Sequence, residues 1–115
     1  MSSPRRLACV LDEDLDPALA EALENALDWT VTSVRAEGWL GIKNGSLLEA
    51  MAEAHMAVLV TGDRGLYGQR RSQLVALQLG VVLVRDPARA AERIYEIARA
   101  IDVVQGGQLV EVAGA

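Results

Sequence analysis

Short apolar runs alternate with stretches of helical periodicity along this chain. The runs are rich in Val, Leu and Thr, which predicts strands over residues 7–11, 30–34, 57–61, 81–84 and 108–112. Between them, apolar side chains recur at spacings of three and four, which predicts helices over residues 17–27, 46–55, 67–79 and 86 to about 101. Strands that alternate with helices form a mainly parallel sheet with helices on both faces, so the pattern predicts the α/β class.

The starts of three predicted helices carry capping signals. Asp16 and Asp86 each precede a proline, the arrangement of an N-cap residue followed by proline in the first turn. Ser46 and Glu49 have the spacing of a capping box, in which Ser46 caps the helix and the Glu49 carboxylate accepts a bond from the N–H of Ser46. The Asn-Gly pair that begins at Asn44 predicts a turn before that helix.

The composition is that of a globular protein. At 115 residues, with 51% hydrophobic and 23% charged residues, the chain can bury a core as a single domain over residues 1–115. Cys9 is its one cysteine, which excludes an internal disulfide, and its apolar neighbours predict a buried side chain rather than a reactive thiol. The apolar run near the start is too short for a signal peptide or a membrane span, so we expect a cytoplasmic protein.

Charge is distributed unevenly over the chain, whose net charge is −5. Residues 1–63 hold eleven acidic and four basic side chains, a net of −7, whereas residues 64–115 hold five and seven, a net of +2. An acidic chain is not a general nucleic-acid binder. The basic second half nevertheless leaves room for a local surface that contacts phosphate groups.

Acidic residues follow two of the predicted strands. Asp12 comes directly after the strand over residues 7–11, and Asp63 comes two residues after the strand over residues 57–61. If these strands are neighbours, both carboxylates lie at the carboxyl edge of the sheet, where ligands bind in open α/β folds. A divalent cation such as Mg²⁺ prefers oxygen ligands and would offset the repulsion between the acids. Glu13 is a further candidate ligand.

Each of these acids also has a structural interpretation. Asp63 can cap a turn before Arg64, and Glu13 can be a solvated charge. Asp14 can support the helix that starts at Asp16, because negative charge is favourable at a helix N-terminus. Crowded carboxylates without a counter-charge repel each other, so the interpretation depends on what compensates them.

Further candidates lie near the same edge. Glu49 and Asn44 stand where a helix start would face that edge, with the capping box and the turn as their structural alternatives. Arg64 and the pair Arg70-Arg71 follow the second acidic site and either contact phosphate or form a solvated face. The sequence contains no Walker loop, no G-x-G-x-x-G motif and no group of histidines and cysteines suited to zinc.

Three segments together resemble a known family. They read L-D-E-D-L over residues 11–15, G-W-L-G-I-K-N-G-S-L-L over residues 38–48 and V-L-V-T-G-D-R-G-L-Y-G-Q over residues 58–69. In this order they resemble the short PIN-like domains of the DUF5615 group, which are related to the Mut7-C type and to PIN-domain toxins. The resemblance covers roughly residues 7–84. It implies a PIN-like three-layer α/β sandwich that hydrolyses RNA with Mg²⁺ or Mn²⁺, and that is held in check in many relatives by an antitoxin protein.

Carried over residue by residue, the resemblance implies that Asp12 and Asp63 are catalytic metal ligands, with Glu13 beside them. The bound metal would generate hydroxide and stabilise charge on the phosphate. The resemblance also implies that Asn44, in the K-N-G element, lies near the site. Further candidates for holding substrate or assisting at the site are Lys43, Glu49, Arg64 and Gln69. The chain departs from the family pattern at Asp14, where the group usually has Asn, and at Ser46, where it often has Glu.

Two other functions fit part of this pattern. A PIN-like domain with this reduced acidic set can be a binding or regulatory module without catalysis. A receiver domain, which accepts a phosphoryl group on aspartate, also has an acidic pair after its first strand, but it needs a lysine past the last core strand, and Lys43 is the one lysine here. Parallel α/β domains of this size often pair, so a homodimer is a further expectation.

Overall fold

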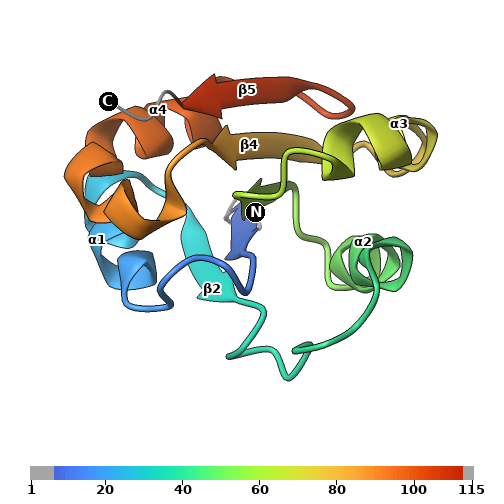
Figure 1. The fold of residues 1–115 in the computed structure, drawn as a ribbon, viewed down its shortest axis with the longest axis horizontal. Coiled ribbons are helices and arrows are strands. Elements are labelled where there is room, and N and C mark those ends of the chain that lie inside the picture. Colours follow the sequence, from blue (N-terminus) through green and yellow to red (C-terminus); the bar gives the residue numbers. More distant parts are fainter. Residues whose placement is uncertain (1–6, 113–115) are drawn as a thin grey trace, which may run out of the picture.

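A computed structural model describes residues 7–112 as one sheet with helices packed on it (Figure 1). The strands are β1 (Ala8–Leu11), β2 (Thr30–Ser33), β3 (Val58–Thr61), β4 (Gly80–Val84) and β5 (Leu109–Val112). The helices are α1 (Leu19–Ala26), α2 (Asn44–Glu53), α3 (Leu66–Leu77), the 3₁₀ helix η1 (Pro87–Arg93) and α4 (Ile94–Val103).

All five strands run parallel, in the order β2-β1-β3-β4-β5. The chain therefore leaves β1 toward one side of the sheet, forms β2, and returns past β1 to form β3 on the other side. Such a reversal opens a crevice at the carboxyl ends of the two strands that flank it. Because β1 and β3 flank it here, the residues that follow these two strands lie at the crevice.

Alternate residues of the central strands face opposite layers, as the geometry of a strand requires. In β1, Cys9 and Leu11 belong to the core on the α1–α4 side, whereas Val10 belongs to the core on the α2–α3 side. Figure 1 shows α1 and α4 together on one side of the sheet and α2 and α3 on the other. The predicted mainly parallel α/β sandwich with helices on both faces is confirmed.

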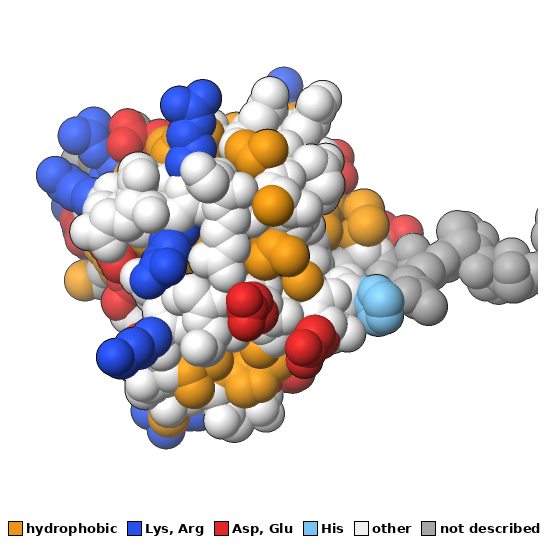
Figure 2. Space-filling model, turned by 90° about the vertical axis from the view of Figure 1, so that its right-hand side faces the viewer, with side chains coloured by type: hydrophobic (Ala, Val, Ile, Leu, Met, Phe, Trp, Pro, Cys, Tyr) orange, Lys and Arg blue, Asp and Glu red, His pale blue; other side chains and the backbone are white. Residues whose placement is uncertain are grey.

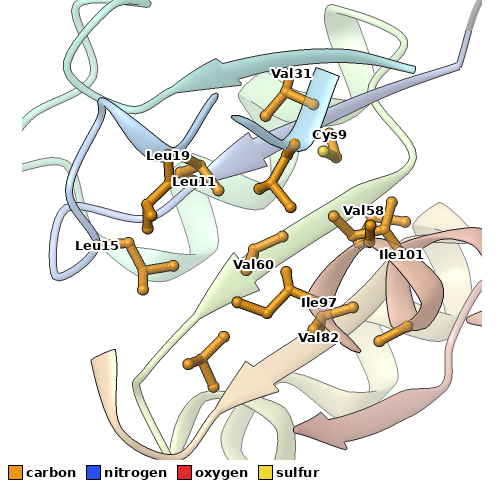
Figure 3. Packing of buried hydrophobic residues seen from close by; sticks show 14 of the residues in the cluster. Cys9, Leu11, Leu15, Leu19, Val31, Val58, Val60, Val82, Ile97 and Ile101 are labelled. Atoms are coloured by element: carbon orange, nitrogen blue, oxygen red, sulfur yellow. The ribbon is translucent and has the colours of Figure 1, made fainter. Parts of the chain in front are cut away.

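The core on the α1–α4 side is built from branched side chains. Val60 and Val82 of neighbouring strands pack against Ile97 of α4 (Figure 3). Cys9 lies in this layer with 0% of its surface exposed. Burial, and to a lesser degree the nearby Glu24 carboxylate, raise the pKa of the Cys9 thiol to about 12, so the thiol is protonated at neutral pH and packs as the small apolar side chain that the sequence predicts.

The helices predicted over residues 17–27 and from residue 86 to about 101 differ from the observed ones. The α1 helix begins at Leu19 rather than at Pro17, although Asp16 caps the preceding turn by accepting a bond of 2.9 Å from the N–H of Ala18. The segment expected as a single helix from Asp86 is divided into η1 and α4, with non-helical backbone angles at Arg89.

The capping box predicted at Ser46 and Glu49 is wrong. The α2 helix begins two residues earlier, at Asn44, and its first turn closes through a bond of 2.8 Å from the N–H of Leu47 to the carbonyl of Lys43. Asn44 and Ser46 therefore both lie inside the first turn, and the Asn-Gly pair forms helix rather than a separate turn. Side chains of the neighbouring α3 helix contact this first turn, as described below.

A side chain of α1 occupies the outer edge of β2. The N–H of Val31 donates a bond of 3.0 Å to the Glu24 carboxylate. The flanking N–H groups of Thr30 and Val34 point the other way, to carbonyls at the β1 side. Because β2 is the edge strand, no further strand of the sheet can accept the Val31 N–H, and the Glu24 carboxylate accepts it instead.

None of the helices in residues 7–112 is long and apolar enough to cross a membrane.

Replacing Leu48 by alanine tests the core on the α2–α3 side. Leu48 of α2 has 0% of its surface exposed, so we expect Leu48→Ala to lower the free energy of unfolding by about 2–5 kcal/mol in urea denaturation. Leu40→Ala is the control, because Leu40 is 45% exposed and its loss removes little buried surface. Equal effects of the two substitutions would contradict the packing described here.

Candidate functional site

The site is built on the alignment of β1 with β3. Leu11 lies opposite Val60, and the ladder continues through a bond of 2.8 Å from the N–H of Asp12 to the carbonyl of Val60. Asp12 therefore lies beside Thr61, and by strand alternation both side chains point to the α2–α3 side. The Thr61 hydroxyl donates a bond of 2.7 Å to Oδ2 of Asp12, so the first predicted site residue is held in a fixed orientation.

The same hydroxyl also positions Asp63. Thr61 Oγ1 accepts a bond of 3.0 Å from the N–H of Asp63, which joins the two predicted acids through one buried side chain. Asp63 in turn accepts a bond of 2.9 Å from the N–H of Gly65 on Oδ1 and one of 3.5 Å from the Asn44 side chain on Oδ2. The structure thus brings Asp12, Asp63 and Asn44 together from three separate elements.

A third aspartate lies at this edge. Asp14 accepts a bond of 2.9 Å on Oδ2 from the N–H of Gly62, which joins the loop after β1 to the loop after β3. Partial burial, the Asp12 charge and, more weakly, the Asp63 charge raise the pKa of Asp14, while the bond from Gly62 opposes that rise. Asp14 is therefore close enough to both predicted ligands to interact with their charges.

The three carboxylates accept hydrogen bonds from neutral groups. Their hydrogen-bond donors are the Thr61 hydroxyl, the Asn44 amide and backbone N–H groups. Within residues 7–112, no lysine, arginine or histidine nitrogen lies within 4.0 Å of their oxygens. The site consequently keeps a concentrated negative charge, the feature that attracts a cation.

The remaining predicted residues are placed around these acids. Gln69 lies beside the loop of Asp63, since its Nε2 is 3.3 Å from where a Cβ on Gly65 would lie. Glu13, Lys43 and Arg64 are exposed neighbours in sequence of the site residues, and the N–H of Glu13 donates a bond of 2.9 Å to Asp12. Glu49 is exposed on the second turn of α2, and the part of the chain that the structure describes gives its side chain no hydrogen bond or ion pair.

The donor chemistry at this edge fits a hard divalent cation. An ionised carboxylate has about four lone-pair sites, and each oxygen of Asp12 and Asp63 accepts one hydrogen bond from residues 7–112, so acceptor capacity remains on both. Mg²⁺ commonly binds through one or two carboxylates and keeps several waters. Residues 7–112 hold no group of three or more acidic, histidine or cysteine side chains that is already arranged around one metal position, so a site here depends on two carboxylates.

Sequence reasoning misses three residues of this site. Thr61 ends the β3 strand and is fully buried (0% exposed). The one signal for it in the sequence is a polar residue at the end of an apolar run. Gly62 is missed as well, although a Cβ there would overlap the ring of Pro87 and lie 2.6 Å from Oδ2 of Asp14. Asp14 has a signal in its spacing of two from Asp12.

No family model, no curated protein and no solved structure matches this chain.

Substituting Gly62 tests the close approach of the loop after β3 to Asp14 and to Pro87. Gly62→Ala places a methyl group against Pro87 and Asp14, and we expect a loss of about 1–3 kcal/mol in the free energy of unfolding. Gly68→Ala is a matched control, because a Cβ at Gly68 meets nothing within 4 Å and alanine favours the helix by roughly 0.5–1 kcal/mol. Chemical denaturation of both variants checks this, and a Gly62→Ala protein as stable as the control would disprove the close approach.

The charge on Asp14 makes stability depend on pH. Because its pKa is raised in the folded state, the folded protein binds more protons than the unfolded chain between the two pKa values, and stability falls as pH rises through that window. In metal-free buffer, Asp14→Asn should therefore melt at a higher temperature than the wild type at pH 7, and the gain should shrink toward about pH 4. Glu53→Gln, at the exposed end of α2, controls for the loss of one negative charge. A gain that does not change with pH would refute this interpretation.

Proposed function

We propose that this protein is a metal-dependent ribonuclease that acts in the cytoplasm. One observation carries the proposal: Asp12, Asp14 and Asp63 meet at the crevice between β1 and β3, and only neutral groups of residues 7–112 compensate them. The resemblance of the three sequence segments to PIN-like domains supports RNA as the substrate. It also supports a cognate antitoxin as a partner and a role as the toxin of such a pair.

Asp12 and Asp63 would hold Mg²⁺ or Mn²⁺, and the bound metal supplies a water of lowered pKa and stabilises charge on the reacting phosphate. The protein contributes the orientation of its ligands. The Thr61 hydroxyl fixes Asp12, and the Asn44 amide and the Gly65 N–H fix Asp63. Ligands held by such outer contacts need little reorganisation when a cation binds.

The polar residues around the acids would hold the RNA strand. Lys43 and Arg64 are exposed and adjacent in sequence to Asn44 and Asp63. Neither basic side chain forms an ion pair with an acid of residues 7–112. Positive charge next to the acids attracts phosphate without neutralising the metal site. Gln69, which lies next to the Asp63 loop, supplies a neutral donor and acceptor at the same place. Glu13 remains a proposed additional ligand, and the exposed Glu49 a proposed accessory residue.

A binding module without catalysis is the second candidate. The observation that favours it is that residues 7–112 hold no prearranged group of three metal-ligating side chains. In that case the acids would be tolerated at a cost in stability, and RNA or protein binding would not depend on metal.

A phosphoacceptor domain has one supporting observation, the strand order β2-β1-β3-β4-β5, which is the order of flavodoxin-like and receiver folds. Strand order alone does not determine function. Asp63 lies two residues beyond the end of β3, and Arg85 follows β4. Labelling with acetyl phosphate distinguishes this candidate, because a stable acyl phosphate on an aspartate would favour it over the nuclease.

Metal binding and RNA cleavage test the nuclease directly. We expect Mg²⁺ or Mn²⁺ to bind the wild type in calorimetry and to support cleavage of mixed-sequence single-stranded RNA. The Asp12→Asn/Asp63→Asn double variant should lose both, with cleavage reduced by about 100-fold or more. The Glu53→Gln variant changes an exposed acid outside this edge and should cleave like the wild type. Cleavage that survives in the double variant, or a wild type that binds neither metal, would refute the proposal.

A further inference from the structure

A single arginine of α3 is held against the first turn of α2. A Cβ built on Gly45 would lie 3.1 Å from Nη1, 3.3 Å from Cζ and 3.6 Å from Nη2 of Arg70. These distances place the end of the Arg70 side chain beside the backbone of Gly45. A Cβ at position 45 would be in tight contact with the guanidinium, which would have to shift by a few tenths of an ångström.

The backbone of α3 departs from helical geometry at Arg70. Arg70 has φ −121° and ψ 19°, which interrupts the helical angles inside α3. The sequence predicts a regular helix here, in which Arg70 and Arg71 would point about 100° apart, and the observed interruption corrects that geometry. One turn later, the side chain of Gln73 donates a bond of 2.8 Å to the carbonyl of Gly45. Two side chains of α3 therefore contact Gly45 in the first turn of α2.

Arg70 carries a positive charge that no acid of residues 7–112 neutralises. Other arginines do form ion pairs, namely Arg85 with Glu111, Arg89 with Glu92 and Arg93 with Glu96. The Arg70 guanidinium instead packs beside the residue next to Asn44, whose amide donates to Asp63. Figure 2 views this α2–α3 side and shows lysine and arginine side chains toward the left of the face.

We propose that Arg70 binds the RNA phosphate next to the one held at Asp12 and Asp63, an inference that rests on the proposed function. A guanidinium offers several donors in a planar fork that matches phosphate oxygens. Arg70 is exposed, and its guanidinium lies beside Gly45 without an acidic partner within residues 7–112. Its donors are therefore available to a phosphate while the carboxylates remain available to a cation.

The test measures binding of a short fluorescein-labelled single-stranded RNA by anisotropy in EDTA, where no metal-dependent cleavage takes place. Arg70→Ala should raise the dissociation constant about fivefold and reduce the slope of its salt dependence by about 0.7. Arg71→Ala is the matched control, because it removes the same charge from the next residue, which is exposed, and it should change the constant less than twofold.

Equal effects of Arg70→Ala and Arg71→Ala would overturn the role of Arg70. Calorimetry with Mn²⁺ on the same variants separates this inference from the nuclease itself, since Arg70→Ala should bind the metal like the wild type. A wild type that binds RNA through Arg70 but binds no metal would refute the nuclease and leave the arginine's role standing. A wild type that binds no RNA in EDTA would overturn the role of Arg70, whereas the nuclease is decided by metal binding and cleavage.

Discussion

The bonds of the Thr61 hydroxyl are the interaction on which the site depends. This one group donates to Asp12 and accepts from the N–H of Asp63, so it fixes the two acids relative to each other. It can do so because β1 and β3 are adjacent and aligned, which places Asp12 beside Thr61 at the end of the ladder. A slip of one residue in this register would turn Asp12 toward the opposite layer. Site geometry is thus a direct result of strand pairing in the core.

The arrangement of charge explains why so many acids are tolerated at one edge. Each carboxylate accepts bonds from neutral donors, which stabilise the ionised form without cancelling its charge. The arginines of residues 85–93 pair with glutamates elsewhere, while the Arg70 guanidinium lies beside Gly45 and pairs with no acid of residues 7–112. The carboxylates at this edge therefore keep their negative charge.

The alternation of apolar runs is sufficient to predict the strands and the α/β class, because strands buried on both faces are apolar throughout. It does not determine strand order, since an apolar run does not identify its neighbours. Details of the site depend on contacts between distant segments. The sequence predicts that Asp14 supports the start of α1, whereas it binds Gly62, 48 residues away in the chain. The first turn of α2 contacts Arg70 and Gln73 of α3, which no local capping rule can anticipate.

The contact between Glu24 and the outer edge of β2 has a consequence for the behaviour of the protein at high concentration. An open strand edge can recruit a strand from another molecule and begin aggregation. Here the outward N–H of Val31 is already bonded to a charged side chain of α1, so an incoming strand would have to displace a carboxylate and bury its charge. Intermolecular sheet growth is therefore disfavoured at the β2 edge by a residue that has no part in the crevice.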